Sequence, residues 1–87
     1  SMLIGQSADS ETEIQIRAIL NARPEIEKVF NVITLQLGPD VMIAIKAKMA
    51  KVDSADQLIE NINTCEKELK NVNPAIKWVF FEPDNKD

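Results

Sequence analysis

The sequence predicts an α+β fold, a two-layer sandwich in which two helices cover one face of a three-stranded sheet in the order α-β-β-α-β. Two segments place apolar residues at helical spacing, and three segments are rich in the β-branched and aromatic residues that favour strands. The 87 residues suffice for one modest core, and no linker-like or low-complexity stretch divides them. We therefore predict a single domain over residues 1–87.

The first helix is expected over residues 10–22. Ser10 and Glu13 have the spacing of a capping box, in which the serine oxygen accepts a free backbone N–H and the glutamate reaches back to the cap. Ile16 and Leu20 then recur at helical spacing. Pro24 ends the helix because it lacks an N–H donor and disfavours a helical residue before it.

Two strands are expected next, over residues 28–37 and 41–48. The first is rich in β-branched side chains, which fit a pleated sheet. The turn Gly38-Pro39-Asp40 joins the two strands, since glycine readily adopts positive φ. A link this short makes an antiparallel hairpin.

The second helix is expected over residues 54–71, with Ser54 and Gln57 again at capping-box spacing. Its apolar residues step by three and four, as in an amphipathic helix; they are Leu58, Ile62, Cys65, Leu69 and Val72. Asn73-Pro74 ends the helix. The last strand covers residues 76–82, before Pro83 and a polar tail at residues 84–87.

Composition argues against several classes of function. A net charge of −4 disfavours a general nucleic-acid binder and adsorption to anionic lipid. No apolar run approaches the roughly 20 residues that span a bilayer, so this segment is not expected to insert into a membrane. The lone Cys65 can form no internal disulfide, which fits a reducing compartment.

Catalysis is also poorly supported by the residue types present. The chain has no histidine for acid–base work, and with only Gly5 and Gly38 it cannot form a glycine-rich phosphate loop. We therefore do not expect an enzyme.

Alternation along the strands divides the sheet into two faces, and the aliphatic-rich sets are expected under the helices. In the first strand that set is Val29, Asn31, Ile33, Leu35 and Leu37. The opposite face still carries large apolar side chains, which a soluble monomer rarely exposes together. We predict that this face is buried in a symmetric homodimer through Phe30, Val32, Met42, Ala44, Lys46, Trp78, Phe80 and Glu82. The alternative is an ordinary core, partly covered by Leu3-Ile4 or by the C-terminal tail.

The ordered motifs resemble the cytoplasmic C-terminal domain of cation diffusion facilitator (cation efflux) transporters. Val29-Phe30-Asn31-Val32 followed by Leu37-Gly38-Pro39 is similar to the family's V-H-D-L strand and G-P turn, after a helix that ends in Asn-Ala-Arg-Pro. Ile43-Ala44-Ile45-Lys46 lies where the family has its second strand, and Val79-Phe80-Phe81-Glu82-Pro83 resembles its closing I-H-V-E-P. The resemblance covers nearly the whole chain and implies a ferredoxin-like domain that dimerises.

The N-terminal residues fit the same interpretation. Leu3-Ile4-Gly5 looks like the short segment that leaves the last transmembrane helix in this family. Residues 3–8 are therefore expected to be a remnant of the linker from the membrane domain. Ser1-Met2 reads as an expression scar.

The chain departs from the family at the metal site. Metal-binding members are expected to carry histidines where this sequence has Phe30, Lys46 and Phe80, and only the acidic position remains, as Glu82. Phenylalanine cannot coordinate an ion and a protonated lysine repels one, whereas zinc usually takes four nitrogen or sulfur ligands. We predict no metal and no cofactor in this domain. Cys65 is expected to be a small core residue instead of a ligand.

Two questions remain open for the charged residues. Lys46 could supply the positive charge that a metal supplies in relatives and pair with Glu82, or it could be a solvated edge residue. Glu82, Asp84 and Asp87 could attract a divalent cation loosely, or they could belong to a frayed, solvated terminus.

The resemblance implies a cytoplasmic dimerisation and regulatory domain attached to the membrane domain of an exporter of divalent cations such as zinc, working by proton antiport. The alternative is a free-standing ferredoxin-like module that binds a small ligand or a protein. Six hydrophobic spans encoded upstream of Leu3 would distinguish the two. An RNA-binding sheet is disfavoured by the acidic charge and by the absence of a leading strand.

Overall fold

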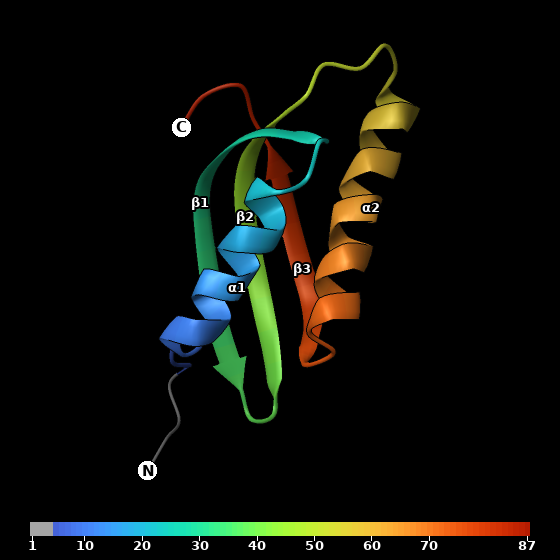
Figure 1. Cartoon of the computed structure of the whole chain (residues 1–87). Coiled ribbons are helices and arrows are strands. Elements are labelled where there is room, and N and C mark those ends of the chain that lie inside the picture. Colours follow the sequence, from blue (N-terminus) through green and yellow to red (C-terminus); the bar gives the residue numbers. More distant parts are fainter. Residues whose placement is uncertain (1–4) are drawn as a thin grey trace.

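Two helices lie on one face of a three-stranded sheet in the computed structural model, which describes residues 5–87 (Figure 1). The helices are α1 (Ser10–Asn21) and α2 (Ala55–Val72), and the strands are β1 (Ile26–Leu37), β2 (Asp40–Met49) and β3 (Ile76–Pro83). This α-β-β-α-β order confirms the predicted ferredoxin-like α+β class. The expected scar at Ser1-Met2 and the segment Leu3-Ile4 lie outside the described residues.

The sheet has the strand order β1-β2-β3, so β2 lies at the centre. β1 and β2 form the predicted antiparallel hairpin, with Leu37 opposite Asp40. Gly38 in the turn has φ 61°, a left-handed conformation that glycine adopts without the strain of a Cβ. The connection through α2 makes β3 run parallel to β2.

The helix ends agree only partly with the predicted caps. Asp9, not Ser10, caps α1: a carboxylate oxygen of Asp9 accepts the N–H of Thr12 at 2.8 Å, and Ser10 is the first helical residue. The Ser10 prediction was wrong because an acidic residue with the same capping chemistry precedes the serine. At α2, Oγ of Ser54 accepts the N–H of Gln57 at 3.1 Å, as predicted for the cap itself.

The core lies between the helices and the sheet. Every second residue of β2 from Val41 to Ala47 is buried, which fixes the face of the central strand that packs under the helices. Both helices and β3 contribute the remaining fully buried side chains, which are Ile16, Leu20, Cys65, Leu69 and Ile76. The predicted alternation along β2, and Cys65 and Leu69 of the predicted stripe on α2, therefore identified core residues correctly.

A register shift in β1 overturns part of the predicted face assignment. Val29 lies opposite Ala47, whereas Asn31 lies opposite Lys46, so β1 contains one extra residue at this point. Beyond this bulge, Val32 packs against the core and Thr34 is only 4% exposed. The prediction that Val32 faces away from the helices is therefore wrong.

The other set of β1 side chains changes sides for the same reason. The prediction placed Ile33, Leu35 and Leu37 under the helices, but the register puts Ile33 opposite Ala44 and Leu35 opposite Met42, on the face away from the helices. Ile33 is 56% exposed. Strict alternation counted through an unrecognised bulge gives the wrong face for everything that follows.

Candidate functional site

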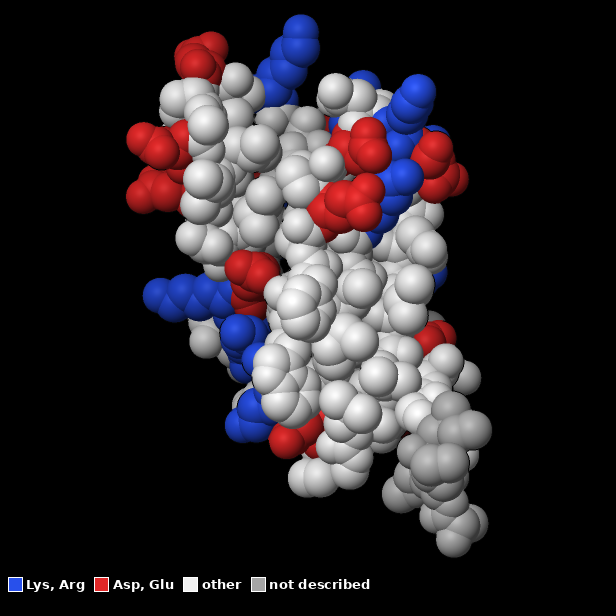
Figure 2. Space-filling view, turned by 180° about the vertical axis from the view of Figure 1, so that it is seen from behind, with Lys and Arg blue, Asp and Glu red and all other residues white. Residues whose placement is uncertain are grey.

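The sheet face away from the helices, here called the open face, carries a continuous apolar patch. By register and alternation, all three strands contribute to this patch, which consists of Ile33, Leu35, Leu37, Met42, Ala44, Trp78 and Phe80. Phe80 is 62% and Trp78 45% exposed, although both are large aromatic side chains. Figure 2 shows this face of the molecule, with a broad uncharged area below a cluster of acidic and basic groups. Exposure of several large apolar residues together is the feature of an interaction surface.

The patch is ordered in rows that run across the strands. The Ala44 row consists of Ile33, Ala44 and Phe80, and the next one, the Met42 row, consists of Leu35, Met42 and Trp78. On the far side of the Ala44 row, Lys46 lies between Asn31 and Glu82. On the far side of the Met42 row, Asp40 lies opposite Leu37. The two apolar rows are thus flanked by a basic residue at one end of β2 and an acidic residue at the other.

The residues predicted for the interface therefore separate into three groups. The structure brings most of them together on the open face, namely Met42, Ala44, Lys46, Trp78, Phe80 and Glu82. Phe30 lies at the bulge, half-buried, with the ammonium of Lys28 5.9 Å from the centre of its ring. Val32 does not belong to this face. Sequence reasoning missed Ile33, Leu35 and Leu37, and only the bulge could have indicated them.

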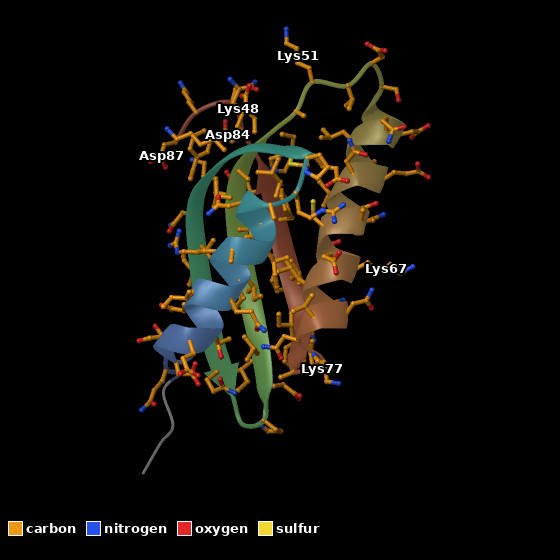
Figure 3. The ribbon with its side chains drawn as sticks, in the orientation of Figure 1. Lys48, Lys51, Lys67, Lys77, Asp84 and Asp87 are labelled. Atoms are coloured by element: carbon orange, nitrogen blue, oxygen red, sulfur yellow. The ribbon has the colours of Figure 1, made fainter. Side chains whose placement is uncertain are left out.

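Within the protomer, Lys46 pairs with Asp84 and not with Glu82, the partner that one of the two open interpretations gave it. It is opposite Glu82 in the register of β2 and β3, but its Nζ lies 3.6 Å from an oxygen of Asp84. Nearby, Nζ of Lys48 lies 2.9 Å from a carboxylate oxygen of Glu27. Figure 3 shows Lys48 and Asp84 at the end of the sheet where β3 ends, and Lys77 at the opposite end. The charged cluster thus borders the apolar patch at the end of the open face where β3 ends.

Asp84 fixes the start of the C-terminal tail. Its backbone N–H donates to the carbonyl of Ala47 at 2.9 Å, and its side-chain oxygen accepts the N–H of Asn85 at 2.7 Å. These backbone donors, that of Asn85 first and that of Lys86 next, hold the pKa of the Asp84 carboxyl below its ordinary value, and the Lys46 ammonium adds to the effect. The tail is therefore tied to β2 at Asp84, and Asp87 beyond it is exposed.

The donor set at this end of the sheet does not fit a transition-metal ion. Phe30, Lys46 and Phe80 offer no ligand, and Glu82 supplies a single carboxylate. Within residues 5–87, the structure contains no group of three or more His, Cys, Asp or Glu side chains that could hold a metal ion. The Lys46 ammonium already lies beside the carboxylate of Asp84.

Cys65 lies on the helix side of the sheet, far from the open face in the layered fold. The thiol is fully buried, and its sulfur lies 3.8 Å from a carboxylate oxygen of Glu25. Arg23 donates two hydrogen bonds of 2.8 Å to the same Glu25. Burial first, and the negative charge of the Glu25 carboxylate next, raise the pKa of the Cys65 thiol to about 11. A protonated, enclosed thiol of this kind is a packing residue and not a nucleophile or ligand.

Comparison with known proteins identifies the fold. No family model matches the chain, and no curated protein matches it. Among solved structures, a nickel form of MamM CTD superposes with a TM-score of 0.79 at 10% identity, covering 91% of this chain and 100% of that one. The metal-bound C-terminal domain of the CzcD transporter from Thermotoga maritima gives a TM-score of 0.76 at 18% identity, covering 85% of this chain and 86% of that one.

A cadmium form of MamM CTD gives a similar result, with a TM-score of 0.77 at 10% identity over 90% of this chain and 98% of that one. At these identities the likeness establishes the three-dimensional arrangement and nothing finer. None of the helices within residues 5–87 has the length and apolar character required to cross a bilayer.

Proposed function

We propose that this chain is the cytoplasmic dimerisation and regulatory domain of a divalent-cation exporter of the cation diffusion facilitator (cation efflux) family. The observation that carries this proposal is the superposition, over nearly the whole length of both chains, with the metal-bound C-terminal domain of a transporter. The order of sequence motifs supports the same family independently. The parent protein would carry a divalent cation such as zinc, by cation/proton antiport, through the membrane domain attached ahead of residues 3–8.

The open face supports the dimerisation part of the proposal. Its aromatic and aliphatic side chains are exposed in one protomer, and burial of such a surface against a second copy removes apolar area from water. Phe80, Trp78 and Ile33 are the most exposed large residues of the patch. They are therefore the proposed centre of the homodimer.

The regulatory part differs from that of a metal-responsive domain. The positions at which the family resemblance implies histidine ligands hold Phe30, Lys46 and Phe80. Apolar contacts and the lysine charge would replace metal coordination between the two copies. This domain would then hold its two membrane halves together at any cytoplasmic metal concentration.

Sedimentation velocity combined with calorimetric titration tests the proposal on the isolated 87-residue chain. We expect a dimer in buffer containing a chelator, with no change in sedimentation and no heat of binding when zinc or manganese is added. A particle of 9.8 kDa at high micromolar concentration would overturn the dimer. Association that requires either metal would overturn the loss of the metal site.

Attachment to a membrane domain has a separate test. The reading frame upstream of Leu3 should encode six hydrophobic spans. A frame that instead encodes no such spans would favour a free-standing ferredoxin-like module, and the open face would then be a binding surface for a protein or a small ligand.

A further inference from the structure

We propose that residues 5–7, here called the entry strap, detach from the edge of β1 as a unit while Ala8 stays anchored, and that this movement is a regulatory device. The entry strap belongs to the linker predicted over residues 3–8. Its regulatory role therefore rests on the proposed membrane domain, which would act on the sheet through this segment. Its detachment is a property of the 87-residue chain alone.

The entry strap lies along the edge of β1, beside which α1 begins (Figure 1). Gly5 lies against Leu35, since a Cβ at Gly5 would collide with the end of that side chain. Leu35 belongs to the apolar patch on the open face. Gln6 forms an isolated antiparallel bridge with Gln36, whose N–H donates to the carbonyl of Gln6 at 2.6 Å. The chain therefore starts beside the open face and follows β1 before it enters α1.

The chain is anchored where it reaches the helix side of the sheet. Ala8 is 6% exposed, and its N–H donates to the hydroxyl of Thr34 at 2.9 Å. The same hydroxyl donates to a carboxylate oxygen of Glu13 in α1 at 2.8 Å. Detachment of Ala8 would leave a buried amide without its partner, which is costly. The anchor at Ala8 therefore ends the segment that can detach.

The entry strap itself is held more weakly than this anchor. Its three residues are all exposed, so water already contacts them and can replace the hydrogen bond between Gln6 and Gln36. Segments with few buried contacts and exposed hydrogen bonds open locally at low cost in free energy. The boundary between the exposed strap and the buried Ala8 thus separates two levels of local stability.

Gln36 connects the entry strap to the β1–β2 turn. Its backbone N–H donates to Gln6, and its side-chain Nε2 donates to the carbonyl of Gly38 at 2.8 Å and to that of Asp40 at 3.3 Å. The neighbouring Leu35 contacts the strap from the apolar patch. Detachment of the strap therefore frees the backbone of Gln36 beside the turn and uncovers Leu35 at the margin of the open face.

Amide hydrogen exchange followed by NMR tests the detachment on the 87-residue chain. The protection factor of the Gln36 amide should be at least about tenfold lower than that of the Ala8 amide, because the strap opens without the anchor. Equal protection of the two amides would show that the strap and the anchor open together, and it would overturn the proposal.

A pair of substitutions tests the contact between Gly5 and Leu35. Gly5 does not have a positive φ, so Leu35, and not backbone strain, opposes an alanine there. Gly5→Ala should lower the protection factor of Gln36 by about a further tenfold, since the crowded strap lifts from β1. Ala8 should be unaffected. In a Leu35→Ala background, which removes the obstacle, the same substitution should change the protection by less than about threefold.

Circular dichroism melting shows that each of these variants is folded. An equal effect of Gly5→Ala with and without Leu35 would show that the strap does not rest on this side chain. Loss of protection at Ala8 together with Gln36 would contradict an anchor at Ala8.

A reversible lock tests the regulatory role. Gln6→Cys combined with Gln36→Cys should allow a disulfide across the bridge, since Cα atoms paired in antiparallel strands lie about 4.5–5.5 Å apart, within disulfide range. The buried Cys65 does not compete for it. In vesicles containing the intact exporter, zinc flux through the oxidised form should be at least about threefold slower than after reduction, because the detached state is no longer accessible.

The single variant Gln6→Cys is the matched control, and its flux should not respond to oxidation or reduction. Equal flux through the oxidised and reduced double variant would overturn the regulatory role. A reading frame without membrane spans upstream would overturn the proposed function and this role with it. The exchange measurements decide the detachment of the strap in either case.

Discussion

The ammonium of Lys46 lies 3.6 Å from a carboxylate oxygen of Asp84, although Glu82 is its neighbour in the register of the sheet. The contact joins the end of β2 to the residue that follows β3. Both side chains are partly exposed, so the attraction between them is screened by water and salt. The backbone around Asp84 therefore has more influence on its titration than Lys46 has.

The titration of Asp84 provides the first prediction. Its pKa is depressed, first by backbone donors and then by Lys46, so the contribution to stability is present above the unfolded-state pKa and is lost as pH falls through the folded-state value. In Lys46→Met the pKa of Asp84 should remain below its ordinary value, because the N–H groups of Asn85 and Lys86 still donate to it. NMR titration of the carboxyl carbon measures this. A return to the ordinary value would show that Lys46 dominates.

Self-association should depend on the open face and not on exposed apolar residues in general. Phe80→Asp should convert the dimer into a monomer, because it places two carboxylates in the apolar contact. Ile59→Asp is the matched control, since Ile59 is 55% exposed but belongs to α2 on the opposite side of the sheet. Sedimentation velocity of both variants decides the matter. Equal weakening by the two substitutions would count against the open face as the interface.

Thr34 should stabilise the segment that enters α1. Its hydroxyl accepts the N–H of Ala8 at 2.9 Å and donates to a carboxylate oxygen of Glu13 at 2.8 Å, in a site where Thr34 is 4% exposed. Thr34→Val should lower the free energy of unfolding by about 1–3 kcal/mol, because the amide of Ala8 loses its partner in a buried position. Urea denaturation measures the change.

The control for Thr34 is Thr64→Val. The hydroxyl of Thr64 donates to the carbonyl of Glu60 on the exposed surface of α2, where water can replace it. Its removal should change stability by less than about 0.5 kcal/mol. Similar losses in the two variants would show that the Thr34 hydroxyl has no special role. Faster hydrogen exchange at Ala8 in Thr34→Val alone would identify the bond that was lost.

Cys65 should report unfolding. At pH 8 the folded protein should react very slowly with a thiol reagent such as Ellman's reagent, since the thiol is buried and its pKa is raised to about 11. Reaction should become fast in denaturant, where the pKa returns to its ordinary value and the sulfur is accessible. The rate in water should follow the population of opened molecules. Rapid labelling of the fully folded protein would contradict the burial of this thiol.

Much of the fold could be predicted because local patterns were consistent with it. Three local patterns each indicate a single element: the apolar stripe on α2 with its Ser54 cap, the short turn at Gly38, and the alternation along β2. None of them depends on contacts between residues that are distant in the sequence. The cap of α1 was misassigned by one residue because Asp9 and Ser10 can both accept a backbone N–H.

The candidate site was predicted less completely, for two physical reasons. A bulge leaves no clear signature in a run of β-branched residues. Val32 was therefore assigned to the open face and Ile33 to the face under the helices, which is the reverse of what the register shows. The partner of Lys46 is decided by the path of the chain after β3, which a capping or alternation pattern does not describe. The patch on β2 and β3 was predicted correctly because neither strand has a shift between Met42 and Lys46.

Because β1 has an additional residue at the bulge, its side chains that face the helices stand at odd-numbered positions before the bulge, as at Val29, and at even-numbered positions after it, as at Thr34. Away from the bulge, insertions or deletions in β1 must therefore come in pairs of residues, since a change of one residue would move the following side chains to the other face of the sheet. A single deletion at Asn31 would leave Val29 two residues before Val32, so the helix-facing side chains on both sides of this bulge would follow one alternating period, and only the shift between Ile26 and Lys28 would remain.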